Sequence, residues 1–472
     1  MKTLTLLFTF AICFASIAQT PCENGTAGPF ECSKVDLLSQ VTLATMNSVK
    51  ANDSWGWTDP IDGKEYALIC LNEATAFIDV SDPVNPIYLG QLPGESTEHT
   101  TWRDVKTYNN YAFIVSEDDG HGMQVFDLTK LRNVANPPVT FTKDAYYDGF
   151  GKAHNIIINE DTGFAYAVGS DTFNEGPHFI NIQDPLNPIA AGGHAANGYC
   201  HDAQVVIYDG PDADYTGREI LFGSNEDEIV IEDVTDKSNV VTISTITYSN
   251  FNYTHQGWLT EDQRYFILGD ETDEINTGIN SRTLVFDFQD LDDPQFKFAY
   301  TGPSPATDHN GYIKGNKFYL ANNAAGFRMI DISDIANNVM TEIAFFDSYP
   351  TNNQAGFNGA WNVYPYFESG NIIISDRSEG MLLVRPLSTL GVDEQKQLVF
   401  EIFPNPTHGN ITIKSSSGTI DSVTITDVSG KQVYAETAVL DGISKEIDLS
   451  ALSNGLYIVT VNNTESHKVI KQ

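Results

Sequence analysis

The chain has 472 residues, with 26 Lys or Arg against 63 Asp or Glu, so its formal net charge is −37 at pH 7. Hydrophobic residues make up 41% and charged residues 19% of the chain, proportions that exclude an intrinsically disordered protein. The excess of acid excludes nucleic acid and anionic membrane surfaces as partners, because the phosphate contacts that dominate such binding would be repulsive.

Residues 1–18 have the pattern of a secretory signal peptide. Lys2 precedes an apolar run, and Ser16 and Ala18 place small residues at the two positions read during cleavage. The run is too short to span a bilayer, and no later stretch approaches the ~18 continuous apolar residues of a transmembrane helix. We expect cleavage after Ala18 and a mature protein without a transmembrane segment.

Four of the five cysteines lie beyond residue 18. Cys22 and Cys32 flank a Gly-containing loop in the segment 19–34, and in an exported protein we expect them to form a local disulfide. Cys70 and Cys200 are interpreted as small buried hydrophobic residues, and whether they pair stays open. Because Cys200 precedes His201, a thiolate nucleophile at this position is a further hypothesis.

A run of apolar residues closed by a polar residue recurs seven times between residues 35 and 390. Its closing positions are separated by 48, 54, 52, 54, 44 and 54 residues, at Asp79, Asp127, Asn181, Asp233, Asp287, Asp331 and Arg385. Each unit offers four short strands and little helix, which is typical of a β-propeller blade. We predict an all-β chain with a seven-bladed β-propeller over 35–390. A β-solenoid would need shorter periods, and separate sandwiches would not repeat so regularly.

The two ends of this region complement each other. The last unit lacks a fourth strand, because the composition changes after Pro386. The segment 35–43 precedes the first unit and has no unit of its own. We expect it to supply the missing strand and close the ring, which would hide both sheet edges.

A polar linker at 391–398 separates the repeats from a tail of different pattern at 399–472. Alternating apolar and polar residues at 411–413, 423–427 and 455–461 predict short strands. The tail is therefore predicted to be a small antiparallel β-sandwich.

The tail resembles the C-terminal sorting domain of type IX secretion cargo. The matching features are the Pro-Asn-Pro turn at 404–406, the Asp-Val-Ser-Gly-Lys turn at 427–431, Asp-Leu-Ser at 448–450, Asn-Gly-Leu-Tyr at 454–457, and Lys468 and Lys471. The resemblance implies a secreted or cell-surface protein that crosses the outer membrane through the type IX secretion machinery. It also implies that the tail is removed and the product is released or tethered to surface polysaccharide.

The body, from about residue 22 to 390, resembles the choice-of-anchor B family, which is built of LVIVD repeats. The matching segments are Cys32 with 35–38, then 55–60, 122–128, 153–156, 201–204, 253–265 and 357–361. That family has no settled biochemical activity. The resemblance therefore leaves the chemistry of the body open.

A second repeated motif lies upstream of each apolar run, at the same spacing along the chain. We expect it to begin the first strand of each unit, which lines the central channel of a propeller. Four of the ten histidines of the chain occupy equivalent places in it: His154, His201, His255 and His309. The other three units present Asp59, Asp104 and Asn358, beside Trp57, Trp102 and Trp361. We expect these side chains to line the channel, with the four imidazoles facing one another.

The link between the second and third strands returns to the same face of the ring, and several of these links are acidic. They place Glu226, Asp270, Glu271 and Asp376 near the imidazoles. Imidazole and carboxylate together favour a divalent Zn, Mn, Fe or Ni ion over Ca, and a bound water would then be a nucleophile at neutral pH. The alternative is that the histidines tie neighbouring strands together by hydrogen bonds, that the tryptophans pack the blades, and that the acids are solvated turns.

Three classes of function are compatible with this pattern. The first is a binding protein that holds a cation, a small ligand or a glycan at the channel mouth, with the tryptophans as a stacking platform. The second is a metal-dependent hydrolase or lactonase at the same place, and the third is a structural or adhesion protein without an axial site. No Gly-x-Ser-x-Gly or His-Glu-x-x-His motif occurs, which disfavours an enzyme without settling the question.

Overall fold

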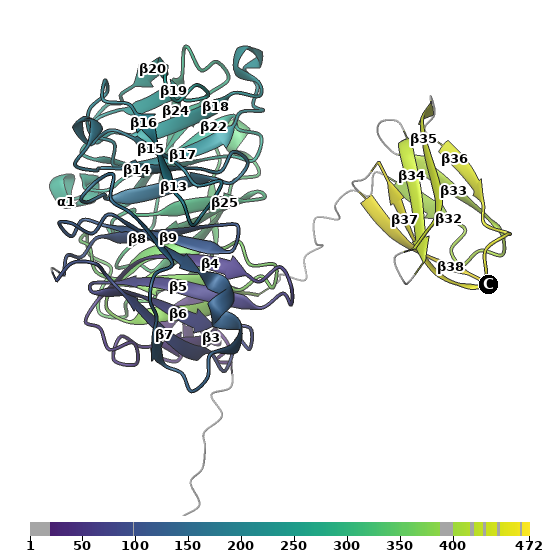
Figure 1. Cartoon of the computed structure of the whole chain (residues 1–472), viewed down its shortest axis with the longest axis horizontal. Helices are drawn as coiled ribbons and strands as arrows, with labels where there is room; N and C mark the ends of the chain where they lie inside the picture. The colour runs from purple at the N-terminus through teal and green to yellow at the C-terminus, as the bar shows by residue number, and fades with distance from the viewer. Residues whose placement is uncertain are drawn as a thin grey trace, which may run out of the picture. The chain divides into compact units, whose positions relative to one another are not determined.

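The computed structural model describes residues 19–97, 99–387, 400–415, 420–427, 431–440, 444–462 and 465–472. The expected signal peptide (1–18) and linker (391–398) lie outside these residues. The chain divides into two compact units, Met1–Leu387 and Ser388–Gln472 (Figure 1), and each is described by itself.

Among the described residues, the first unit contains seven sheets, each with a run of four antiparallel strands. Three of the runs are β4 (Ala51–Thr58), β5 (Glu65–Leu71), β6 (Ala74–Asp79) and β7 (Ile87–Pro93); β8 (Arg103–Tyr108), β9 (Tyr111–Ser116), β10 (Met123–Asp127) and β12 (Ala145–Tyr147); and β13 (Asn155–Asn159), β14 (Phe164–Val168), β15 (His178–Asn181) and β16 (Ile189–Gly193).

Three more runs come next in chain order. They are β17 (Asp202–Ile207), β18 (Glu219–Ser224), β19 (Ile229–Asp233) and β20 (Val241–Ile246); β21 (Thr254–Leu259), β22 (Tyr265–Asp270), β23 (Arg282–Asp287) and β24 (Gln295–Thr301); and β25 (Gly311–Lys314), β26 (Lys317–Ala321), β27 (Phe327–Asp331) and β28 (Thr341–Phe346). The seventh joins β29 (Ala360–Tyr364), β30 (Ile372–Asp376) and β31 (Gly380–Pro386) to β3 (Val35–Val41), which comes from the beginning of the chain.

Short elements complete the first unit. Strand β11 (Val139–Thr140) runs parallel to β7, and β1 (Thr26–Ala27) and β2 (Phe30–Ser33) extend the sheet of β28. The described helical turns are α1 (Asp273–Thr277), η1 (Leu128–Asn133), η2 (Phe173–Glu175), η3 (Ala213–Tyr215) and η4 (Ile335–Asn337). The unit is therefore predominantly β, as its repeats predict.

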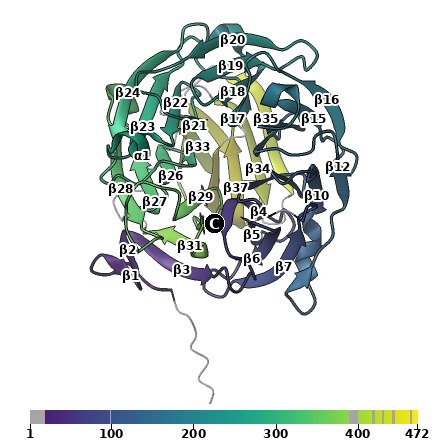
Figure 2. The same cartoon turned by 90° about the vertical axis from the view of Figure 1, so that its left-hand side faces the viewer.

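The first strands of the seven sheets contact one another in sequence. Each of β4, β8, β13, β17, β21, β25 and β29 packs against the next, and β29 also packs against β4. Figure 2 shows the sheets around a common centre, with β20, β24 and β28 at the periphery. This arrangement is propeller-like, and it brings seven strand beginnings to one central region.

The middle strands of each sheet are buried because neighbouring sheets cover both of their faces. All seven residues of β5 are buried, and Phe77 of β6 stacks on Phe126 of β10 in the next sheet with ring centroids 4.6 Å apart. Such aromatic pairs contribute roughly 0.5–1.5 kcal/mol beyond their buried area. The apolar runs of the repeat thus form the contacts between sheets.

Strand β3 forms an antiparallel pair with β31, in a register that places Val35 opposite Pro386 and Val41 opposite Met381. Leu38, in the middle of β3, is 1% exposed. The N-terminal segment therefore lies where the incomplete last repeat calls for a fourth strand.

The cysteines outside the signal segment have two environments. Cys22 and Cys32 form a disulfide that holds the segment before β3 against β2. Cys70 and Cys200 are free and buried, and burial raises the pKa of both thiols. A thiolate nucleophile at Cys200 is therefore disfavoured, because the reactive form of cysteine is the deprotonated one.

The second unit consists of two antiparallel sheets around a small apolar core. One sheet contains β32 (Phe400–Phe403), β33 (Asn410–Ser415) and β36 (Ser444–Asp448), and the other contains β34 (Ile420–Asp427), β35 (Gln432–Leu440), β37 (Gly455–Val461) and β38 (Glu465–Lys471). Ile411, Ile425 and Val459 are fully buried between them. In the described parts of both units, no helix is long and apolar enough to cross a bilayer.

Candidate functional site

Four imidazoles form a continuous arc where the inner strands begin. His154 precedes β13, His201 precedes β17, His255 is the second residue of β21, and His309 lies two residues before β25. The ring centroids of successive histidines are 4.2, 4.3 and 4.5 Å apart. The expectation that these side chains meet at the centre agrees with this geometry.

Two further side chains continue the arc beyond His309. The Trp361 ring, in β29, lies 4.3 Å from the His309 ring between centroids. The guanidinium of Arg377, which directly follows β30, lies 5.3 Å from the Trp361 ring centroid. The Arg377 guanidinium and the His309 ring therefore both lie beside the Trp361 ring.

Polar residues at the beginnings of the inner strands tie neighbouring sheets together. The Nδ1 atoms of His201 and His309 lie 2.9 and 2.6 Å from the carbonyl oxygens of His255 and Trp361. The residue after the histidine also makes such bonds: Asn155 donates to the His201 carbonyl of the next sheet, and Asn310 donates to Asp53 of β4, with the β29 sheet between them. The hydrogen-bonding role weighed from the sequence is thus present, and it uses only one of the two imidazole nitrogens.

The hydrogen bond to Trp361 determines the tautomer of His309. A carbonyl oxygen only accepts, so Nδ1 carries the proton and Nε2 keeps its lone pair. Within the part of the chain that the structure describes, His309 Nε2 has no hydrogen-bond partner although the residue is only 3% exposed. It faces the carboxylate of Glu271, which directly follows β22.

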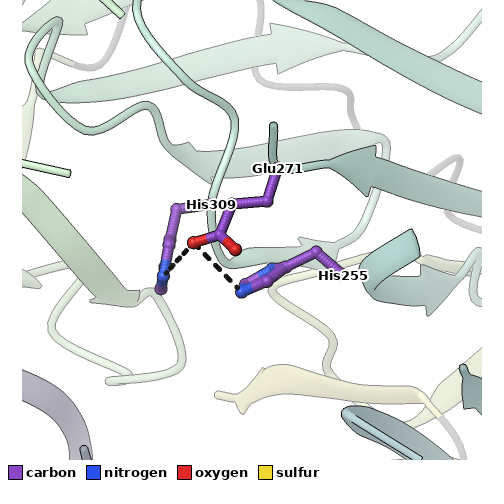
Figure 3. Close-up of side chains that lie close together, drawn as sticks. All are labelled: His255, Glu271 and His309. Carbon is purple, nitrogen blue, oxygen red and sulfur yellow. Dashed lines mark ion pairs between the residues drawn. The ribbon is translucent and has the colours of Figure 1, made fainter. Parts of the chain in front are cut away.

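Glu271 Oε1 lies 3.6 Å from His255 Nε2 and 3.4 Å from His309 Nε2 (Figure 3). Both distances exceed the ~2.7–2.9 Å of a charge-assisted N–H···O hydrogen bond. They match two ligands that each stand about 2.1 Å from a zinc ion at a tetrahedral angle, which are roughly 3.4 Å apart. The two distances from Glu271 Oε1 are therefore those expected between ligands of one metal ion.

Burial shifts the protonation of all three groups. It lowers the pKa of His309 to about 3 and that of His255 well below its ordinary value, in the latter case with help from the neighbouring His201. Burial also raises the pKa of Glu271 to about 7. The imidazoles are neutral at physiological pH, so His309 Nε2 turns a lone pair toward Glu271, and the two groups repel each other when Glu271 is ionised. A proton or a cation between them would remove that repulsion.

These groups line a cavity of about 250 Å³, which we call the axial cavity. Its wall is formed by Asp53, Trp102, Arg103, Glu117, His154, Asn155, Tyr199, His201, Tyr253, His255, Glu271, His309, Asn310, Phe357, Trp361 and Arg377. The charged groups at its wall are mostly paired: Glu117 Oε1 lies 2.5 Å from His154 Nδ1, and Arg103 pairs with Asp118 behind the wall.

Only part of the predicted metal set converges on one point. The ligand atoms of His255, Glu271 and His309 all lie within 4.8 Å of one another, whereas His154 and His201 do not belong to this group. His154 is held by Glu117, and His201 contributes its ring to the arc. Of the four equivalent histidines, only two converge. The third member of the cluster is an acid, Glu271, from the link after β22.

The predicted positions of Trp57 and Asp59 are wrong, because neither lines the axial cavity. Trp57 stacks on Tyr66 in the core, and Asp59 follows the far end of β4, where it forms an ion pair with Arg132. Strand β4 begins at Ala51, so Asp53 is the residue of the first sheet that reaches the cavity. The Trp-Gly-Trp sequence at 55–57 lies further along β4 than Asp53, the residue that reaches the cavity.

Five other predicted residues also lie outside the cavity wall. Asn358 and Glu226 are exposed, Glu226 in a β-bridge with Thr254, and Asp104 is buried beside Lys106. Asp270 accepts hydrogen bonds from Tyr248, Arg282 and the backbone of Asn252 and Tyr253, and Asp376 accepts one from Ser348. These acids stabilise the links that carry Glu271 and Arg377. Trp102 and Trp361 do line the cavity.

Arg377, Glu117 and Asp53 were not predicted as site residues. Arg377 and Glu117 belong to links that also hold Asp376 and Asp118, and the strand register decides which neighbour faces the cavity. The polar residue that follows His154, His201, His255 and His309 was a usable signal, because its counterpart in the first unit is Asp53.

Comparison with known families identifies the tail. Residues 401–472 match the family described as the secretion system C-terminal sorting domain. This domain marks proteins that the type IX system exports to the cell surface or exterior, which confirms the predicted localisation. It also supports the type IX machinery as a partner of the tail. No curated protein matches the chain.

Two solved structures are similar to the chain at low identity. A protein from Lactobacillus plantarum is 12% identical with a TM-score of 0.45, over 84% of this chain and 98% of that one. A functionally unknown protein from Desulfotomaculum acetoxidans DSM 771 is 13% identical with a TM-score of 0.45, over 68% and 94%. Neither comparison assigns a chemistry to the axial cavity.

Proposed function

We propose that this exported chain is a metal-binding protein in which His255, Glu271 and His309 hold one divalent transition-metal ion. The observation that carries the proposal is the lone pair of His309 Nε2, which is buried, has no donor among the described residues and faces a carboxylate oxygen 3.4 Å away. A cation bound by both atoms replaces this repulsion with two favourable contacts.

The ligand types select the class of metal. Two neutral imidazoles with one carboxylate suit Zn, Fe, Mn or Ni, whereas Ca prefers six to eight oxygen ligands. The Nδ1–H of His309 donates to the Trp361 carbonyl, which is the outer hydrogen bond that orients a metal-binding imidazole. Zinc, which has no redox chemistry of its own, is the ion of choice for binding experiments.

We also propose that the first unit is a closed seven-bladed β-propeller of the choice-of-anchor B type. Seven sheets, the packing of β29 against β4, and the pairing of β3 with β31 support this proposal. The ligands of the site come from two neighbouring sheets: His255 from β21, Glu271 from the link after β22, and His309 from the segment before β25.

A metal-dependent hydrolase or lactonase is the second candidate. Its supporting observation is that only three protein ligands converge and that they border the axial cavity. A three-ligand site leaves a coordination position for water, whose pKa a metal lowers toward 7. Hydrolysis would therefore use the same ion, and it requires the binding site to exist.

Metal analysis of untagged protein tests the proposal. We expect about one transition-metal ion per chain after incubation with zinc and gel filtration, and its loss in His309→Ala. The His201→Ala variant is the matched control, because His201 belongs to the same arc but not to the three converging ligands. Stoichiometry near zero in the wild type would refute the metal site and leave ligand binding without a metal, or adhesion. Equal loss in both variants would instead assign the ion to the wider arc.

A further inference from the structure

We propose that the axial cavity binds a small anionic molecule, with its carboxylate or phosphate group held between the metal ion and Arg377. This inference rests on the proposed metal site, because the ion supplies the second positive charge. It concerns the ligand of that site, which neither the sequence motifs nor the comparisons identify.

Arg377 has an unusual lack of partners for a partly buried arginine. Its only hydrogen bond from the side chain among the described residues runs from Nη1 to the Phe357 carbonyl, 3.2 Å away, and no described carboxylate pairs with it. A guanidinium has five N–H donors, so most of them remain available. In a chain with 26 basic and 63 acidic residues, an unpaired arginine at a cavity wall is unexpected.

The other arginine of the cavity wall shows the contrast. Arg103 is 2% exposed. Its guanidinium forms hydrogen bonds with Asp118 at 3.2 Å, His121 at 2.6 Å and the Leu71 carbonyl at 3.2 Å. That arginine supports the wall of the cavity. Arg377 retains donors that a ligand in the cavity can use.

Arg377 is also fixed in place. Its backbone N–H donates to the Gly359 carbonyl at 2.8 Å, and its guanidinium lies over Trp361, whose ring lies beside His309. Burial lowers the pKa of Arg377, which indicates a cation partly removed from water. An oxyanion would offset that cost, and a positioned guanidinium binds carboxylate or phosphate through paired N–H donors.

The acids of the cavity wall are all engaged by other groups once the metal is bound. Glu271 is then a metal ligand, Glu117 is engaged by His154, and Asp53 accepts hydrogen bonds from Asn310 and Asn362. The cavity, at about 250 Å³, lies just below the ~300–1,000 Å³ of typical ligand pockets, so the ligand is small. Since the protein as a whole repels anions, binding should require the metal.

Calorimetric titration of zinc-loaded protein with malonate and with inorganic phosphate tests the inference and separates the two anion classes. We expect at least one to bind the wild type and to lose about 10- to 100-fold in affinity in Arg377→Gln, as for one charge-assisted contact. Arg377→Lys should recover part of the loss. Arg385→Gln, which alters an arginine bonded to Asn371 outside the cavity, should change nothing.

Zinc content is measured in the same samples, so the two proposals fail separately. Unchanged zinc with equal anion affinity in wild type and Arg377→Gln would overturn the role of Arg377 and leave the metal site intact. Zinc-loaded wild type that binds neither anion, or metal-free protein that binds either equally well, would also overturn the inference. Absence of zinc from the wild type would overturn both proposals.

Discussion

Replacing Glu271 with Gln should lower the zinc affinity of the axial cavity by more than 100-fold while leaving the fold intact. The amide has nearly the same shape as the carboxylate, so packing is preserved, but one of three protein ligands loses its charge. Loss of an outer hydrogen-bond partner alone costs 10- to 100-fold in metal affinity, and loss of a direct ligand should cost more. Competition with a chromophoric zinc chelator measures the change.

Glu117→Gln is the matched control for that variant. Glu117 is also a carboxylate at the cavity wall, but it pairs with His154 and lies outside the three converging ligands. Its replacement should reduce zinc affinity by less than about tenfold, below the 10- to 100-fold cost of losing an outer hydrogen-bond partner, because Glu117 is bonded to His154 and not to a proposed ligand. If both variants lose zinc equally, the ion is held by the general acidity of the cavity, and the assigned ligand set is wrong.

Replacing Asp118 with Ala should destabilise the first unit by about 3–5 kcal/mol, because it removes one partner of a buried ion pair. Arg103 and Asp118 are 2% and 0% exposed, and their charged atoms are 3.2 Å apart. Without Asp118 the guanidinium stays buried with only a carbonyl and the His121 ring as partners. Denaturant unfolding monitored by tryptophan fluorescence measures the loss.

Two further variants separate this cause from a general loss of packing. The Asp118→Ala/Arg103→Leu double variant should recover most of the stability, because apolar replacement of a whole buried pair is often neutral. Asp62→Ala, which removes an exposed partner 4.0 Å from Lys64, should cost less than about 1 kcal/mol. A cost at Asp118 no larger than that at Asp62 would contradict a stabilising role for the buried pair.

Repetition made the fold predictable, because the β-run of each unit appears with the same spacing and the same polar end. Strand β3 illustrates how far this extends: Leu38 and its neighbours had no unit of their own, and they lie against β31. The site was less predictable. In the first unit the Trp-Gly-Trp sequence suggested an alignment that the actual start of β4 at Ala51 does not support.

The acidic links show why the ligands could not be selected from the sequence. Asp270 and Glu271 are adjacent, yet the first is buried against Arg282 and the second faces His255 and His309. In the same way, Asp376 accepts a hydrogen bond from the buried Ser348, whereas Arg377 lies over Trp361 at the cavity wall. Which neighbour reaches the cavity depends on strand register, since successive side chains point to opposite faces. A single sequence carries the residue types, and only the three-dimensional structure resolves their directions.

The most direct test is an anomalous difference map at the zinc edge from crystals of untagged, zinc-loaded protein. The proposed ligand set predicts one strong peak in the axial cavity, about 2.0–2.2 Å from His255 Nε2, His309 Nε2 and a Glu271 oxygen. A cavity without a peak, or a peak held by His154 and His201 without Glu271, would contradict it.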